Sequence, residues 1–114
     1  MLVTELSEAT QIIEISDERY EEPGLLRLRG DLLEATGDRT AAQQNYSLAL
    51  TVAARQSAKT FEIRAATSLA RLWLDRGKRD EARNLLAPIY NWFTEGFDTP
   101  FLREARAVLE QIAD

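Results

Sequence analysis

The feature that most constrains the fold of this chain is a pair of glycines forty residues apart, Gly37 and Gly77. When they are aligned, GDRTAAQQNYSLAL, residues 37–50, lies over GKRDEARNLLAPIY, residues 77–90. Both segments are rich in Ala, Leu, Gln and Arg, which form helices readily. Because repeats with periods of about 20 to 50 residues are typical of stacked helical arrays, the chain is predicted to consist of similar helical units.

The residues that match across this offset have the sizes that packed helical hairpins require. Gly30 and Ala70 are both small, and Tyr46 and Leu86 are both large. A small residue lets two helices approach closely, and a large one fills the groove between them. Each unit is therefore predicted to be a helix–turn–helix hairpin that stacks on the next.

The positions of glycine and proline divide the chain into about six expected helices. No stretch alternates between polar and apolar residues as a strand does, so the predicted fold class is all-α. Gly37 and Gly77 are expected to end helices in left-handed C-caps, and Asp38 to cap the start of the next helix. Short connections make consecutive helices antiparallel. The expected helices span residues 3–15, 22–36, 39–56, 59–76, 79–95 and 100–113.

The length of 114 residues fits one domain, residues 1–114, which the repeat subdivides. The offset places Leu6 under Tyr46 and Leu109 over Leu69, so partial units are expected on both sides of the full ones. This pattern is typical of a piece of a longer array. The expected parts are a half repeat at 1–16, repeats at 22–57 and 59–95, and a closing half repeat at 99–113.

The residue types present exclude several kinds of chemistry. The chain has no cysteine and no histidine, which removes thiol nucleophiles, disulfides, Cys/His zinc sites and imidazole acid–base catalysis. Phosphate-binding glycine motifs are absent. The carboxylate pairs Asp31/Glu34 and Asp80/Glu81 fall on expected exposed faces or turns rather than in a water-poor cleft. We expect no enzymatic activity, and no catalytic, cofactor-binding or metal-binding residues.

Charge and hydropathy narrow the range of partners. The net charge is −5, and residues 1–22 carry seven carboxylates against Arg19 alone. Binding to nucleic acid requires a basic face, so it is not expected. Apolar runs are much shorter than the roughly 18 residues of a membrane span, and the first residues lack the features of a secretory signal. We expect a cytoplasmic protein without membrane contact.

The repeat resembles the tetratricopeptide repeat, whose signature combines W-x2-L-G-x2-Y, A-x3-F and a final proline. The first aromatic residue is absent here, Ala54 and Thr94 replace the prolines, and the period is 40 residues rather than about 34. The resemblance implies a TPR-like α-solenoid fragment. The matching residues are Leu26, Arg29, Gly30, Leu33, Gly37, Ala42, Tyr46 and Ala49 in the first unit, and Ala66, Leu69, Ala70, Trp73, Gly77, Ala82 and Leu86 in the second.

A longer resemblance covers residues 17–112. ARQSAKTFEIRAATSLARLWLDRGKRDEARNLLAPIY and NWFTEGFDTPFLREARAVLEQI resemble the C-terminal helical-repeat region of bacterial multidomain signalling proteins. In those proteins a class III adenylate or guanylate cyclase domain and a large predicted ATPase module precede the repeats. The resemblance implies a sensing or partner-binding arm, and it transfers no catalysis because none of the cyclase or ATPase motifs occurs here.

The first helix of each stacked hairpin is expected to line a concave groove. Arg64 and Arg71 are seven residues apart and share a helix face, which suits the clamping of a carboxylate or phosphate. The alternative is a solvated face with ion pairs Arg27–Asp31 and Arg71–Asp75. The expected groove residues are Arg27, Asp31, Glu34, Arg64, Thr67, Arg71 and Asp75.

Five of the aromatic residues lie between residues 89 and 102. Phe93 continues the apolar face of the fifth helix and is expected in the core, whereas Trp92 falls off that face and is the candidate surface aromatic. Phe97 is expected to act as a hydrophobic staple at the start of the last helix. The helical register does not decide whether the Phe101 side chain is packed or exposed.

Two functions follow from these observations. The first is a non-catalytic module that binds a protein or peptide, the regulatory or sensing C-terminal arm of a larger signalling ATPase or cyclase. Asp31 is expected to repel an acidic tail, which argues against the carboxylate clamp of some tetratricopeptide repeats. The second is self-association into a homodimer through apolar stripes at the ends, Leu6/Ile13 or Leu102/Leu109.

Overall fold

The computed structural model describes residues 22–113, which form five α-helices and contain no strand. The all-α prediction is confirmed for these residues, and four of the five helices begin and end within one residue of the expected positions. The helix expected at residues 3–15 lies outside the described residues. The helices are α2 (Glu22–Ala35), α3 (Arg39–Arg55), α4 (Lys59–Asp75), α5 (Arg79–Asn91) and α6 (Pro100–Ala113).

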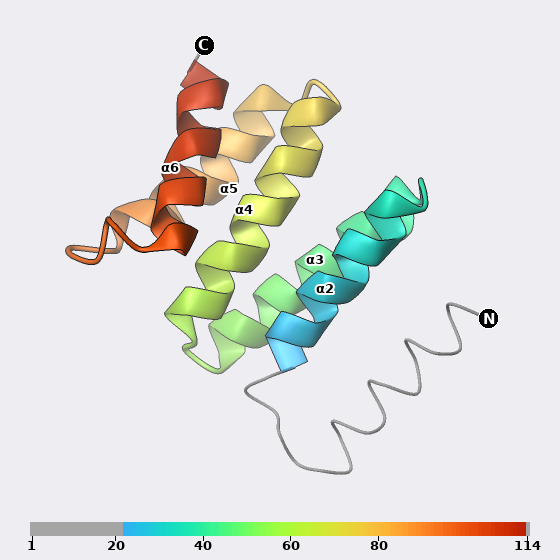
Figure 1. Cartoon of the computed structure of the whole chain (residues 1–114), viewed down its shortest axis with the longest axis horizontal. Helices are drawn as coiled ribbons and strands as arrows, with labels where there is room; N and C mark the ends of the chain where they lie inside the picture. Colours follow the sequence, from blue (N-terminus) through green and yellow to red (C-terminus); the bar gives the residue numbers. More distant parts are fainter. Residues whose placement is uncertain (1–21, 114) are drawn as a thin grey trace.

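The five helices form two layers, with each helix antiparallel to the next (Figure 1). In this view α2, α4 and α6 make the nearer layer, and α3 and α5 lie behind them. Helix α4 is central, because it packs against the other four helices. The layer of α2, α4 and α6 therefore contains the helices that begin the two expected repeats and the closing half repeat.

The same left-handed turn recurs every twenty residues along the chain. Gly37, Ser57 and Gly77 have φ values of 89°, 54° and 78°. In each turn an N–H group reaches back over the end of the helix to a carbonyl oxygen five residues earlier, as in the Schellman motif. These bonds are Asp38 N–H to Leu33 O (2.8 Å), Ala58 N–H to Ala53 O (2.9 Å) and Lys78 N–H to Trp73 O (2.8 Å).

The predicted caps at Gly37 and Gly77 are confirmed. The Asp38 side chain also accepts a hydrogen bond from the Ala41 N–H (3.1 Å), which confirms its role as the N-cap of α3. The sequence placed a connection at residues 57–58 but did not indicate its left-handed residue, because a serine rather than a glycine occupies position 57. Glycine avoids the steric cost that a side chain has in this conformation, and Ser57 does not.

Gly30 and Tyr46 bring α2 and α3 into close contact. A Cβ atom at Gly30 would lie 2.5 Å from Cε1 of Tyr46, so the ring occupies the space that any other residue would need. Tyr46 itself is buried. In the second unit Ala70 and Leu86 occupy the matching positions and are buried in one cluster. The close approach predicted at the small residue is therefore confirmed at Gly30.

The fifth helix is shorter than predicted, since it ends at Asn91 rather than near residue 95. Its end tightens into bonds between residues three apart, from the Trp92 N–H to Ile89 O (3.3 Å) and from the Phe93 N–H to Tyr90 O (3.1 Å). Such bonds close a helix instead of extending it. The segment up to Pro100 is therefore a loop.

This early end changes the predicted positions of the aromatic side chains. Phe93 lies beyond the regular helix and is only partly buried, although it packs against the core cluster, so its predicted place in the core is confirmed in part. Trp92 is 56% exposed, which confirms it as a surface aromatic. Phe97 is also exposed, and its ring lies 5.7 Å from that of Tyr90. Phe101 is partly buried, 6.3 Å from the ring of Phe93.

Helix α6 covers the C-terminal end of the core. Leu102 is 1% exposed and Leu109 is partly buried, both in the cluster shared with α4 and α5. The expected apolar stripe Leu102/Leu109 is therefore not free for self-association, because this chain already covers it. The opposite side of α6 carries the exposed ion pair Arg106–Glu110 (3.5 Å). The other expected stripe, Leu6/Ile13, lies outside the described residues.

Replacement of Ser57 by glycine is expected to stabilise the fold. The substitution removes the left-handed strain of a side chain at φ 54° and should raise the free energy of unfolding by about 1 kcal/mol. Urea denaturation measures the change. Ser57→Ala is the control, because alanine keeps a Cβ atom and should leave stability close to that of the wild type. A loss of stability in Ser57→Gly would contradict the explanation.

The close contact at Gly30 predicts a coupled pair of substitutions. Gly30→Ala should destabilise the chain by about 1–2 kcal/mol, because the clash with Tyr46 outweighs the better helix propensity of alanine. Combining it with Tyr46→Leu recreates the Ala70/Leu86 pair of the second unit. A double-mutant cycle should then show a smaller loss than the sum of the two single losses. Additive losses would mean that the two residues are not in steric contact.

Candidate functional site

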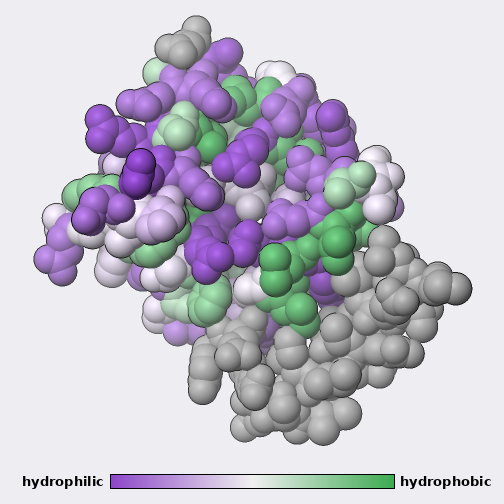
Figure 2. Space-filling model, in the orientation of Figure 1, coloured by the Kyte–Doolittle hydropathy of each residue, from purple (hydrophilic) through white to green (hydrophobic). Residues whose placement is uncertain are grey.

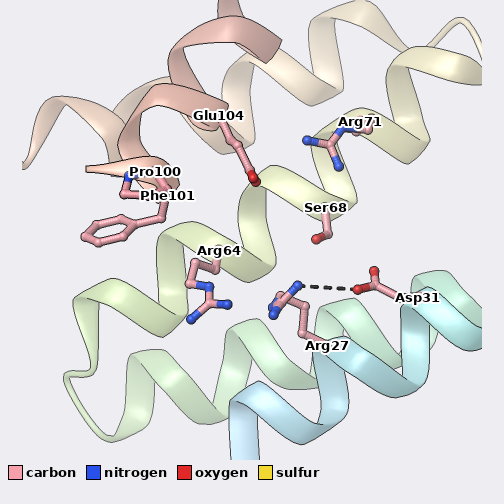
Figure 3. A pocket seen from close by; sticks show the side chains of 8 residues that line it. All are labelled: Arg27, Asp31, Arg64, Ser68, Arg71, Pro100, Phe101 and Glu104. Atoms are coloured by element: carbon pink, nitrogen blue, oxygen red, sulfur yellow. Dashed lines mark hydrogen bonds and ion pairs between the residues drawn. The ribbon is translucent and has the colours of Figure 1, made fainter. Parts of the chain in front are cut away.

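A pocket of about 370 Å³ lies between the three helices of the nearer layer (Figure 3). Hydrophilic side chains gather at the middle of this face, and a hydrophobic patch lies over α2 (Figure 2). Each of the three helices contributes one part of the wall, so the pocket exists only where these helices pack side by side. The lining residues are Arg27 and Asp31 of α2, Arg64, Ser68 and Arg71 of α4, and Pro100, Phe101 and Glu104 of α6.

Helix α4 contributes the floor of the pocket. Arg64, Ser68 and Arg71 are spaced by four and three residues, which places them on one face of the helix. The opposite face carries Ala66 and Ala70, both fully buried. The requirement to bury these alanines against the core therefore directs the two arginines and the serine into the pocket.

The pocket contains three guanidinium groups and two carboxylates. Arg27 Nη1 lies 3.4 Å from Asp31 Oδ2, the ion pair that the sequence offered as an alternative to ligand binding. Within residues 22–113, neither Arg64 nor Arg71 forms an ion pair, and the expected Arg71–Asp75 pair is absent. Two exposed cationic side chains on one helix face therefore have no counterion among the described residues.

Tyr46 holds Asp31 from inside the first hairpin. Its hydroxyl lies 2.6 Å from Asp31 Oδ1 and 2.9 Å from Glu34 Oε1. A hydroxyl has a single hydrogen, so the two carboxylates compete for one donor. Asp31 thus has two internal partners, Tyr46 and Arg27. This weakens the repulsion toward an acidic partner that the sequence led us to expect from Asp31.

The phenol of Tyr46 is kept protonated by its surroundings. Burial raises the pKa of Tyr46 far above its ordinary range, and the hydrogen bonds to Asp31 and Glu34 raise it further. All three effects disfavour a phenolate, which would be desolvated beside two carboxylates. Tyr46 therefore acts as a permanent donor that ties α3 to the polar side of α2.

The structure brings together four of the seven expected groove residues: Arg27, Asp31, Arg64 and Arg71. Thr67 is only 3% exposed and donates a hydrogen bond to Ile63 O (2.7 Å), so its assignment to the groove was wrong. Glu34 lies within hydrogen-bond distance of the Tyr46 hydroxyl and does not line the pocket. Asp75, the last residue of α4, does not line it either.

Sequence reasoning missed the remaining lining residues. Ser68 carried a usable signal, because it lies between Arg64 and Arg71 on the same helix face. Pro100, Phe101 and Glu104 carried no comparable signal, since their position depends on how α6 packs on α4. The contribution of α6 to the pocket is therefore a tertiary feature.

Trp92 forms a separate surface feature at the end of α5. Lys59 Nζ lies 4.9 Å from the centroid of its ring, within the range of a cation–π contact. The edge of Phe93 meets the same ring at 5.1 Å. These contacts account for the position of the indole, and Trp92 does not line the pocket.

The pocket combines hydrogen-bond donors with an apolar wall. Guanidinium groups and a serine hydroxyl donate hydrogen bonds to anionic oxygens, and Pro100 with Phe101 supplies an apolar wall. Residues 22–113 contain no cluster of three or more metal-ligating side chains. No helix in that part of the chain is both long enough and apolar enough to cross a bilayer.

Comparison with known proteins does not assign this arrangement to a family. No protein-family model, no curated protein and no solved structure matches the chain. The resemblance to tetratricopeptide repeats and to the helical region of cyclase–ATPase signalling proteins therefore stays a prediction. The geometry of the pocket and of the helix layer that forms it is therefore the basis for inferring a function.

The hydrogen bonds of Tyr46 predict a pH-dependent difference between the wild type and Tyr46→Phe. Because the folded-state pKa of Tyr46 is raised, its stabilising effect is complete below about pH 10 and is lost as the pH rises above that value. At pH 8 the substitution should cost about 1–3 kcal/mol of unfolding free energy. Urea denaturation between pH 8 and pH 11 should show this difference shrinking above pH 10. A difference that grows instead would contradict the role of Tyr46 as a donor.

Proposed function

We propose that this chain is a non-catalytic interaction module that binds a peptide, or an exposed segment of another protein, on the face formed by α2, α4 and α6. The observation that carries the proposal is the pocket between these helices, in which Arg64 and Arg71 are exposed and have no ion-pair partner among the described residues. Cations without internal partners are poorly explained by the stability of the fold alone. They are well suited to a partner that supplies the opposite charge.

The architecture supports a TPR-like solenoid fragment as the framework of this module. The left-handed turns at residues 37, 57 and 77 and the paired contacts Gly30/Tyr46 and Ala70/Leu86 repeat from one unit to the next. Stacked repeats of this kind create extended surfaces that bind partners. The resemblance to multidomain signalling proteins adds the proposal that the module is the regulatory or sensing C-terminal arm of a larger ATPase or cyclase.

An apolar stripe on α2 extends the proposed surface beyond the pocket. Leu28 and Leu32 are 50% and 47% exposed, one helical turn apart. The hydrophobic patch over α2 lies on the same face as the hydrophilic side chains of the central region (Figure 2). A partner that crosses this face would therefore meet arginines in the pocket and leucines beside it.

Self-association is the second candidate function, and the exposed pair Leu28 and Leu32 is the observation that favours it. A dimer that covers this stripe would bury apolar surface without using the arginines of the pocket. Light scattering after gel filtration distinguishes the two functions. A strict monomer at all micromolar concentrations would remove the dimer and leave the interaction module intact.

The interaction module is tested with a displayed library of short peptides and direct measurement of affinity for the selected sequences. Arg64→Ala/Arg71→Ala should weaken the selected peptides roughly tenfold or more, because hydrogen bonds to charged groups are lost. The matched control is Arg76→Ala/Arg103→Ala, which removes two exposed arginines outside the pocket and should retain binding. Failure to select any peptide, or equal affinity in both double variants, would contradict the proposal.

A further inference from the structure

We infer that the pocket recognises one anionic oxygen group, a carboxylate or a phosphate, held between Arg27 and Arg64 and flanked by an apolar group that packs on Phe101. This inference rests on the proposed function and specifies the part of the partner that enters the pocket. It commits to a single anion, because the far side of the pocket carries the carboxylate of Glu104.

Two like charges, those of Arg27 and Arg64, converge in the pocket. The guanidinium groups of Arg27 and Arg64 point into the same space between α2 and α4 (Figure 3). Like charges repel, and this repulsion disfavours the arrangement unless an anion lies between them. Asp31 does not fill that position, because it approaches Arg27 from the other side and is shared with Tyr46. The space between the two guanidinium groups is therefore the place for an anion from outside the chain.

Arg27 has an incomplete set of hydrogen bonds among the described residues. Its side chain is only 17% exposed, and its Nε atom is buried without a hydrogen-bond partner. A guanidinium has five N–H donors, and Asp31 accepts from one of them, at Nη1. Buried donors normally have an acceptor. A carboxylate or phosphate supplies several acceptor oxygens at once, which suits this largely buried cation.

Arg64 and Ser68 of α4 provide further donors for a bound anion. Arg64 is exposed on α4 and has no ion pair among the described residues, so its side chain is available to close over a bound anion. The planar fork of a guanidinium matches both carboxylate and phosphate oxygens. Ser68, one turn further along α4, adds a hydroxyl donor to the same wall.

An apolar wall lies next to the place proposed for the anion. Pro100 and Phe101 line the side of the pocket above Arg64 (Figure 3). The ring of Phe101 packs at an angle to that of Phe93, with centroids 6.3 Å apart. An apolar or aromatic group bonded close to the anion would pack against this wall. Glu104, on the same helix, disfavours a second negative charge at that end.

The inference is tested by NMR titration of the whole chain with four probes that separate charge from apolar contact. The probes are inorganic phosphate, phenyl phosphate, 3-phenylpropanoate and the uncharged 3-phenylpropan-1-ol. At least one of the two aromatic anions should bind roughly tenfold more tightly than both the alcohol and inorganic phosphate. Which aromatic anion binds more tightly shows whether the pocket prefers a phosphate or a carboxylate.

Variants locate the bound probe. Arg27→Gln and Arg64→Gln should each weaken the preferred aromatic anion roughly tenfold, and the matched charge control Arg76→Gln should not. Phe101→Ala should remove the advantage of phenyl phosphate over inorganic phosphate. Asp31→Asn should tighten anion binding several-fold, because it removes a competing charge and keeps an acceptor for Tyr46. A gain of affinity in this variant cannot arise from loss of the fold.

Several outcomes would overturn the inference. One is equal binding of the alcohol and the aromatic anions, and another is equal affinity in Arg27→Gln, Arg64→Gln and Arg76→Gln. Selected peptides without any acidic or phosphorylated residue that bind Arg27→Gln as tightly as the wild type would refute the inference while the proposed function stands. Specific binding of the aromatic anion together with failure to select any peptide would support the inference and refute the proposed function.

Discussion

The close contact between Gly30 and Tyr46 joins the first two helices and fixes one edge of the pocket. The missing side chain at Gly30 lets the ring of Tyr46 lie against α2, which sets the distance between the first two helices. Burial of that ring also buries a hydroxyl, which needs acceptors. Asp31 and Glu34 supply them from the same helix. One steric fit thus fixes the geometry of the hairpin and positions the carboxylate that pairs with Arg27 at the edge of the pocket.

Repetition of the same turn places alternate helices in one layer and forms the face that carries the pocket. Each left-handed residue reverses the chain after a helix, so α2, α4 and α6 lie in one layer with α3 and α5 behind them (Figure 1). Stacking requires small buried residues such as Ala66 and Ala70 on one side of α4, and the residues on the other side are left to face the pocket. Arg64 and Arg71 face it, and neither forms an ion pair with another residue of the described range 22–113.

Much of the fold was predictable because the responsible signals are local. Glycine in a left-handed cap and an apolar pattern with helical period act within a few residues, so the helices and their order could be read directly. The left-handed conformation of Ser57 shows the limit, because a serine in that conformation carries no recognisable signal. The overestimated length of α5 has a similar origin, since its end depends on a tightened last turn rather than on Gly96. Thr67 was misplaced because register alone could not show that α4 is covered on that side as well.

The sequence was sufficient to predict the all-α class, the antiparallel order of the helices, the small residue at position 30 and the shared face of Arg64 and Arg71. These features depend on spacing along one helix or across one turn. Only the tertiary structure decided that Phe101 and Glu104 join the arginines, that Tyr46 binds Asp31, and that the apolar side of α6 is covered. Those contacts join residues far apart in the chain, and their geometry depends on how whole helices pack, which local spacing does not encode.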